Sequence, residues 1–361
     1  MSRQKKLLTF LLILLLFLTF PSPSPLAYSP RANSPLATLP LTDMGTDTYL
    51  GFEGGLYPDS NTLPPAHASA GVRATFAIQP RAVDGSPDPN GTILLLSIGM
   101  SNANQEFCGS TDPALPCHPW TFMGQAATHP NINPTLTLLN GAAGGQVAYT
   151  WNDPTDPNYD RIRDDLLAPL GLSENQVQIV WAKVANPNPS VSLPAANADA
   201  YLLLNLMGSI ARALKTRYPH LQQVFFTSRL YAGYATTPLN PEPYAYESGF
   251  AVKWLIEAQI HQMDTGEIDP LAGDLAYPTT APWLAWGPYL WADGTNPRSD
   301  GLTWASEDFE ADGTHPSQLG ETKVGAMLLD FFLNSPQTMC WFRAGEVCGG
   351  HTVFLPLIAS P

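Results

Sequence analysis

Residues 92–102, TILLLSIGMSN, decide the fold class of this chain. Positions 92–98 form a short, nearly continuous apolar run, which is typical of a strand buried on both faces of a parallel sheet. Gly99 permits a tight turn after that strand, and Ser101 then stands beyond its carboxyl end. Four more runs of this kind predict the remaining strands, at residues 135–139, 178–184, 223–228 and 283–286.

Between the predicted strands lie segments with a helical pattern. Apolar residues share one stripe in three of them, over residues 198–218, 247–263 and 316–333. Residues 107–134 show little such pattern, so the first crossover is the least defined. Strands that alternate with helices predict an α/β protein, a three-layer α/β/α sandwich with a mostly parallel sheet of about five strands, over residues 70–335.

The composition excludes several classes of protein. Of the 361 residues, 44% are hydrophobic, which is enough for a buried core and excludes wholesale disorder. The 17 basic and 31 acidic residues give a net charge of −14, so nucleic acid and anionic membrane surfaces would repel the chain. We therefore expect no nucleic-acid partner, whereas neutral or cationic partners remain open and the oligomeric state does not follow from the sequence.

The N-terminus predicts export. Basic residues precede an apolar run over residues 7–20, which is too short to span a membrane and is typical of a signal peptide. We expect residues 1–27 to be that peptide, with an uncleaved anchor as the alternative. No later stretch looks transmembrane, so we expect a secreted or cell-surface protein with no membrane span after cleavage. From their composition we expect residues 28–69 to form a Pro/Ser-rich linker and N-terminal extension. The aromatic residues within 51–65 could pack on the domain.

Four cysteines fit an exported protein. Cys108 and Cys117 are nine residues apart, and Cys340 and Cys348 are eight residues apart. We predict a disulfide within each pair, which an oxidising compartment permits, and a Cys-clipped tail at residues 336–361. Zinc binding is the alternative, but the chain has no CxxC or HExxH motif, so we expect no metal site.

Two loops carry residues suited to nucleophilic catalysis. Ser101 follows the first strand, at the edge of the sheet where ligands bind in open parallel sheets. The loop DGTHPS, residues 312–317, places Asp312 three residues before His315, with Pro316 expected at the first position of a helix. A serine hydroxyl needs a base to take its proton, and that base needs an acceptor on its other nitrogen. Taken singly, each loop is explained as well by a capping turn.

A glycine-rich loop, NGAAGGQ at residues 140–146, follows the second strand. A main-chain N–H can approach a developing oxyanion only where no side chain intrudes, so a glycine here is a candidate donor. Loop flexibility is the other explanation for the glycines.

Together these features resemble the SGNH (GDSL-like) hydrolase superfamily over about residues 90–335. The Gly-x-Ser-Asn pattern is closest to the GQSN block of acetylesterases acting on sialic acid and acetylated xylan, although Met100 replaces the Gln. The resemblance implies the flavodoxin-like SGNH hydrolase fold and no cofactor. It also implies that Ser101 is the nucleophile, His315 the base and Asp312 the acid that orients the base. Gly145 is the implied oxyanion donor, with Gly144 as the alternative.

The third block of that family, Gly-x-Asn-Asp, is not cleanly present. KVANP at residues 183–187 stands in its place, and Asn186 is the candidate side-chain donor. The missing Gly and Asp indicate altered oxyanion geometry, an unusual subfamily or lost catalysis. The α/β-hydrolases fit less well, because Ala103 stands at the second Gly of their Gly-x-Ser-x-Gly motif and their Asp and His lie far apart.

The expected activity is that of a secreted serine esterase that hydrolyses acyl esters. A preference for O-acetyl carbohydrate esters rests on the Gly-x-Ser-Asn resemblance alone. Arg229 and Tyr231, in the loop after the fourth strand, are candidate substrate contacts, with loop packing as the other explanation. A non-catalytic surface or carbohydrate-binding protein that retains the fold is the alternative, and a label for reactive serines distinguishes the two.

Overall fold

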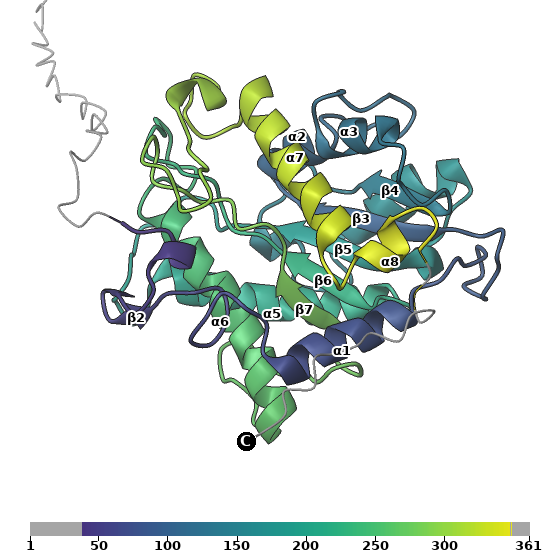
Figure 1. The fold of residues 1–361 in the computed structure, drawn as a ribbon, viewed down its shortest axis with the longest axis horizontal. Coiled ribbons are helices and arrows are strands. Elements are labelled where there is room, and N and C mark those ends of the chain that lie inside the picture. Colours follow the sequence, from purple (N-terminus) through teal and green to yellow (C-terminus); the bar gives the residue numbers. More distant parts are fainter. Residues whose placement is uncertain (1–37, 347, 349–361) are drawn as a thin grey trace, which may run out of the picture. The chain divides into compact units, whose positions relative to one another are not determined.

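The computed structural model describes residues 38–346 and 348 (Figure 1). Its main sheet has five strands, β3 (Ile93–Gly99), β4 (Leu136–Asn140), β5 (Val177–Lys183), β6 (Gln223–Phe226) and β7 (Trp283–Trp286). They lie in the order β4-β3-β5-β6-β7, and every neighbouring pair is parallel. Counted along this sheet, that is the 2-1-3-4-5 order of flavodoxin-like folds. The predicted fold class is confirmed, and all five predicted strands are present within about two residues of their predicted ends.

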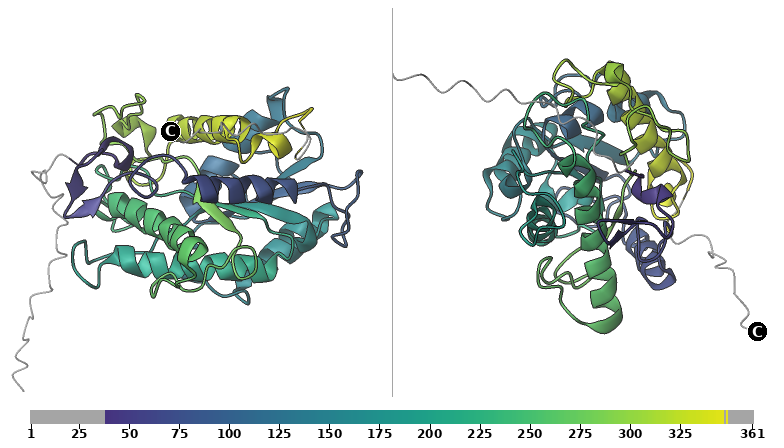
Figure 2. Two further views of the ribbon diagram at one scale, coloured as in Figure 1. Left: turned by 60° about the horizontal axis from the view of Figure 1, so that its bottom comes forward. Right: turned by 90° about the vertical axis from the view of Figure 1, so that its left-hand side faces the viewer.

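Helices cover both faces of the sheet (Figure 2). Along β3 the side chains of Leu94, Leu96 and Ile98 join one hydrophobic cluster, and those of Ile93 and Leu95 join the other. Because successive side chains of a strand point to opposite faces, a strand covered on both sides must be apolar throughout. This is the physical reason for the unbroken apolar run in the sequence.

One layer of helices contains α5 (Asp199–Arg217) and α6 (Tyr244–Thr265), and the other contains α1 (Pro65–Phe76) and α7 (Gln318–Asn334). The shorter helices are α2 (Ser101–Phe107), α3 (Phe122–Thr128), α4 (Pro157–Arg161) and α8 (Met339–Phe342). The described chain also has five short 3-10 turns, η1 (Leu41–Asp43), η2 (Ala148–Thr150), η4 (Ala168–Leu170), η5 (Glu174–Gln176) and η6 (Ser306–Asp308), and one π-helical segment, η3 (Ile162–Leu167). The three predicted helices correspond to α5, α6 and α7 and are confirmed.

Helix α1 was not predicted from the sequence, because it packs through small residues. Its buried positions include Ala70, Gly71 and Ala74 rather than large apolar side chains. A Cβ on Gly71 would overlap the Trp283 ring, so this close approach requires glycine. Small residues give a weak apolar stripe in the sequence even where they allow the closest packing.

The segment before α1 packs on α6. Strands β1 (Thr48–Tyr49) and β2 (Phe52–Glu53) form an antiparallel hairpin. The Tyr49 ring contacts Phe250 of α6, with ring centroids 5.6 Å apart. The predicted domain start at residue 70 therefore lies inside α1, and the structured chain already begins before it.

The two predicted disulfides are confirmed. The Cys108 and Cys117 sulfurs are 2.07 Å apart, and those of Cys340 and Cys348 are 2.04 Å apart. The predicted signal peptide and the apolar end of the tail lie outside the described residues. Among helices of the described chain, none combines the length and apolar content needed to cross a bilayer.

Candidate active site

Ser101 begins helix α2 directly after the turn that ends β3. That turn requires glycine, because Gly99 has φ +146° and a Cβ there would overlap the Lys183 carbonyl oxygen. Met100 is extended, and Ser101 is the first residue of the helix. The sequence Gly-Met-Ser thus turns the chain sharply and leaves the Ser101 side chain at the carboxyl edge of the sheet.

His315 contacts Ser101 directly, although 214 residues separate them in the chain. Ser101 Oγ lies 2.7 Å from His315 Nε2, and His315 Nδ1 lies 2.6 Å from Asp312 Oδ2. The chain of contacts is satisfied when Nδ1–H donates to the carboxylate and Nε2 accepts the serine proton. The structure therefore brings together the three residues that the sequence suggested for this role.

The loop that carries Asp312 and His315 is fixed by its own main chain. Asp312 Oδ1 accepts hydrogen bonds from the N–H groups of Thr314 at 2.9 Å and His315 at 3.0 Å. Burial acts to raise the pKa of Asp312, but these N–H groups and the His315 side chain outweigh it and hold the pKa below its usual value. Asp312 therefore stays ionised at neutral pH, as an acceptor for a histidine proton must.

Helix α7 starts later than predicted. Ser317 is its N-cap, with its hydroxyl oxygen accepting from Leu319 N–H at 3.2 Å, and the helix begins at Gln318. Pro316 therefore lies before the cap rather than at the first helical position. A serine cap is favoured because its oxygen takes one of the free N–H groups of the first turn.

The glycine-rich loop lies beside the turn that precedes Ser101. Ala143 N–H donates to the Gly99 carbonyl oxygen at 3.1 Å, which ties the loop to the end of β3. Gly144 and Gly145 are exposed, and Gly145 has φ +77°. Within the described chain no acceptor takes the main-chain N–H of either glycine, or that of Ser101. These three N–H groups are among the free main-chain donors at this edge of the sheet.

Asn186 follows β5, but its carboxamide is turned to Asp199. Asn186 Nδ2 lies 3.1 Å from Asp199 Oδ1 and 3.4 Å from Asp199 O, so both of its N–H groups have acceptors. The residue lines a cavity of about 420 Å³ together with residues of the loop 187–191 and of α5. In this geometry Asn186 offers no free N–H to an oxyanion.

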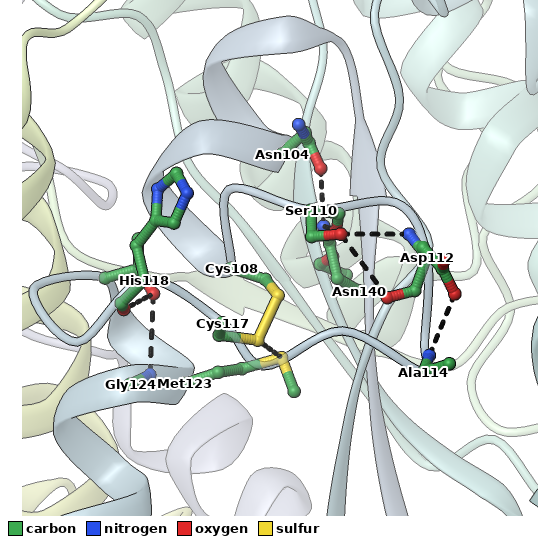
Figure 3. The surroundings of a disulfide bond; sticks show 12 residues. Asn104, Cys108, Ser110, Asp112, Ala114, Cys117, His118, Met123, Gly124 and Asn140 are labelled. Carbon is green, nitrogen blue, oxygen red and sulfur yellow. Dashed lines mark hydrogen bonds between the residues drawn. A yellow bond between two sulfur atoms is a disulfide. The ribbon is translucent and has the colours of Figure 1, made fainter.

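The carboxamide of Asn140, at the end of β4, likewise has hydrogen-bond partners on both its nitrogen and its oxygen. Its Nδ2 donates to Asn104 Oδ1 at 2.6 Å and to the Ser110 carbonyl oxygen at 2.7 Å, and its Oδ1 accepts from Ser97 at 2.7 Å. Figure 3 shows Asn140 with Asn104 and Ser110 beside the Cys108–Cys117 disulfide. These bonds attach the disulfide-closed loop to the strand ends and to helix α2.

The two candidate substrate contacts are placed differently from each other. Arg229 is 2% exposed and donates from Nη1 to Asn102 Oδ1 at 2.9 Å, so its charge points into the protein. Tyr231 is half-buried and packs edge-on against Tyr234 and Trp291. A platform formed by both side chains does not match this geometry, because the guanidinium is not at the surface.

A buried ion pair joins helix α2 to the end of β5. Lys183 Nζ contacts both carboxylate oxygens of Glu106, at 2.6 Å to Oε2, and both side chains are 0% exposed. Burial raises the pKa of Glu106 and lowers that of Lys183 to about 8, and the opposite charge of the partner counters each shift. Nothing in the sequence indicated this pair, because the two residues lie 77 positions apart.

No group of three or more His, Cys, Asp or Glu side chains suited to a metal ion occurs within residues 38–346. At this edge of the sheet the structure brings together a hydroxyl, an imidazole in contact with a carboxylate, and free main-chain N–H donors. Such a set suits transfer of an acyl group to serine.

Neither a family model nor a curated protein sequence matches the chain. Among solved structures, it is similar to a protein classed as a GDSL-like lipase from Parabacteroides merdae, with 12% identity, a TM-score of 0.38, and 66% of this chain and 94% of that chain covered. It is also similar to a family two carbohydrate esterase from Clostridium thermocellum solved with cellohexaose, with 15% identity, a TM-score of 0.37, and 69% and 66% covered. A family two carbohydrate esterase from Cellvibrio japonicus gives 12% identity, a TM-score of 0.36, and 69% and 62% covered. Such distant likeness concerns the fold alone, and the chemistry has to be judged from the side chains.

Proposed function

We propose that the chain is a serine ester hydrolase of the SGNH type, with Ser101 as nucleophile, His315 as base and Asp312 as the orienting acid. The observation that supports this most directly is the pair of contacts at 2.7 Å and 2.6 Å that joins the three side chains in that order.

The proposed reaction follows the order of these contacts. Ser101 Oγ attacks the acyl carbon while its proton passes to His315 Nε2, and the imidazolium is stabilised by Asp312. His315 then gives that proton to the leaving alkoxide, so the alcohol departs and an acyl-serine remains. Water attacks the acyl-serine through the same base, releases the carboxylic acid and restores the hydroxyl.

The developing oxyanion needs donors already in place. We propose the main-chain N–H groups of Ser101 and Gly145 for this, with Gly144 as the adjacent alternative, since none of the three has an acceptor within the described chain. Asn186 is not proposed as a donor, because its amide is held by Asp199. An oxyanion site of main-chain donors is compatible with a third block that lacks the Gly and Asp of the family pattern.

The substrate proposal is an acyl ester, with O-acetyl groups on carbohydrate as the first candidates. It rests on the Gly-x-Ser-Asn pattern of residues 99–102. We also propose that the protein acts outside the cell, which the two disulfides support because such bonds persist in oxidising compartments.

A fluorophosphonate probe tests the proposal, because only an activated serine reacts with it. We expect one label per chain, on Ser101 by peptide mapping, and no label in Ser101→Ala. Hydrolysis of p-nitrophenyl acetate and of acetylated oligosaccharides should be lost in the same variant. An unlabelled, inactive wild-type protein would instead favour the non-catalytic alternative.

A further inference from the structure

Asn102 joins the nucleophile helix to the loop that carries the base. Its Nδ2 donates to the Thr314 carbonyl oxygen at 2.9 Å, across 212 residues of sequence. Asn102 directly follows Ser101, and Thr314 directly precedes His315. Among the described residues, this bond and the Ser101–His315 contact are the two hydrogen bonds between α2 and residues 308–317.

Asp312 and His315 belong to one loop, so their mutual contact moves with the loop and does not fix its place. The distance between Ser101 Oγ and His315 Nε2 depends instead on how the loop sits against α2. A hydrogen bond between the residues adjoining these two side chains acts on that placement directly, in addition to the bond from Thr236 N–H to the Asp312 carbonyl oxygen at 2.9 Å. Asn102 is therefore in a position to control the proton transfer without touching the reacting atoms.

Arg229 determines which way the Asn102 carboxamide faces. A guanidinium has only donors, so its Nη1 contact at 2.9 Å requires the oxygen of Asn102 on that side. The amide nitrogen must then face Thr314 O, as observed. The main chain of Arg229 is held by α6, because its N–H donates to Ser248 Oγ at 3.1 Å, and its side chain is buried.

We propose that Arg229 and Asn102 form a positioning relay, in which Arg229 orients Asn102 and Asn102 sets the His315 loop against Ser101. The inference rests on the proposed function, since it concerns the same reaction. Arg229 is a positioning residue here, rather than a substrate contact, because its side chain does not reach the surface.

The test is a double-mutant cycle with Asn102→Leu and Arg229→Met, which replace both polar groups by apolar ones of similar size. A misplacement of about 1 Å can cost about 10²-fold, so we expect Asn102→Leu to lower kcat on p-nitrophenyl acetate by about that factor. We expect KM to stay within about twofold, because no substrate contact is removed. Arg229→Met should lower kcat about tenfold in the wild-type protein. In the Asn102→Leu variant the same substitution should change kcat hardly at all, since Arg229 acts through Asn102.

Two measurements distinguish positioning from a general loss of stability. The downfield proton resonance of the His315 Nδ1–H···Asp312 bond should persist in Asn102→Leu, while the rate of fluorophosphonate labelling falls with kcat. Arg229→Lys keeps a donor for Asn102 and should recover most of the activity lost in Arg229→Met. If Asn102→Leu does not fold, the comparison of Arg229→Met with Arg229→Lys still tests whether Arg229 acts as a positioning residue.

Asn133→Leu is the matched control. Asn133 makes the same kind of bond, from Nδ2 to the Trp341 carbonyl oxygen at 2.9 Å, but it precedes β4 at the opposite edge of the sheet. We expect its kcat to be that of the wild type.

The proposal is overturned if Asn102→Leu keeps kcat within about threefold, if KM rather than kcat changes, or if Asn133→Leu loses as much activity. It is equally overturned if the Arg229→Met effect is undiminished beside Asn102→Leu. A wild-type protein that takes no label refutes the proposed function and the relay with it, whereas a labelled wild type and an equally labelled Asn102→Leu refute the relay alone.

Discussion

Replacing Asp312 by asparagine separates the two tasks of this carboxylate. Oδ1 holds the loop by accepting two main-chain N–H groups, at 2.9 Å and 3.0 Å, while Oδ2 accepts from His315 Nδ1 at 2.6 Å. In Asp312→Asn the amide oxygen can keep the two main-chain bonds. The amide nitrogen then faces Nδ1, which must become an acceptor, so the histidine proton moves to Nε2 and Ser101 has no base.

The size of the effect follows from these contacts. A flip of the amide in Asp312→Asn would restore the correct tautomer but would set the amide nitrogen against the two main-chain N–H groups. Losing two hydrogen bonds at about 1 kcal/mol each makes the flipped form about 30-fold rarer. The neutral amide also stabilises the imidazolium less than a carboxylate by roughly 1.5–3 kcal/mol, or about 10- to 160-fold. We therefore expect kcat/KM to fall by about 10³-fold, or roughly 4 kcal/mol.

The assay is p-nitrophenyl acetate hydrolysis together with the rate of fluorophosphonate labelling, both at neutral pH. Asp84→Asn is the control, because Asp84 Oδ1 also closes a turn, accepting from Ser86 N–H at 2.9 Å, in an exposed loop. Its kinetics should match those of the wild type. A loss below about tenfold in Asp312→Asn would show that His315 does not depend on Asp312 for its tautomer, and the proposed mechanism would be wrong.

Three further outcomes are expected. Ser101→Ala and His315→Ala should each abolish turnover, and the double variant should be barely worse than either because the residues act as a unit; additive losses in the kinetics would contradict this. Asn186→Ala should change kcat less than about threefold, whereas removal of an oxyanion donor typically costs about 10²–10³-fold, so a loss of that size would return Asn186 to the site. Glu247→Gln should flatten the pH dependence of the free energy of unfolding. Burial raises the pKa of Glu247 from 4.5 to about 7 despite bonds from Leu193 N–H and Tyr49. The folded protein thus holds more protons than the unfolded chain in that window, and its stability falls as the pH rises through it. Urea titrations should show the variant more stable than the wild type at pH 8 by about 1–3 kcal/mol. If the free energy of unfolding changes equally with pH in both proteins, the raised pKa does not belong to Glu247.

The parts of the fold that the sequence predicted are those in which one physical requirement acts on consecutive residues. Strand β3 is buried on both faces, so every position from Ile93 to Ile98 faces the interior, and the run is visible without any knowledge of the partners. Helix α1 follows no such rule. Its contact with Trp283 depends on an absent side chain at Gly71, and a missing Cβ has meaning only once the opposing ring is known.

The residues of the candidate site also differ in how far the sequence could predict their roles. Asp312 and His315 could be proposed because a local loop supplies both groups, and their spacing of three residues is visible in the sequence. Asn186 was proposed from its place in a family pattern, and the contact with Asp199 that occupies its amide depends on where the loop after β5 meets α5. Arg229 looked like a surface side chain because nothing local indicated a buried acceptor 127 residues away.

The buried polar contacts of α2 share a physical role that apolar packing alone would not provide. The helix has seven residues and no side-chain cap, so it has little stability of its own. Asn102 attaches it to the His315 loop, Asn104 to the end of β4, and Glu106 to Lys183 at the end of β5. A buried ion pair contributes little net stability, because removing two charges from water costs several kcal/mol for each ion. Directional bonds nevertheless fix a rotation and a register that apolar contacts would leave adjustable. In a helix whose first residue is the proposed nucleophile, that register decides whether Ser101 Oγ lies within reach of the base.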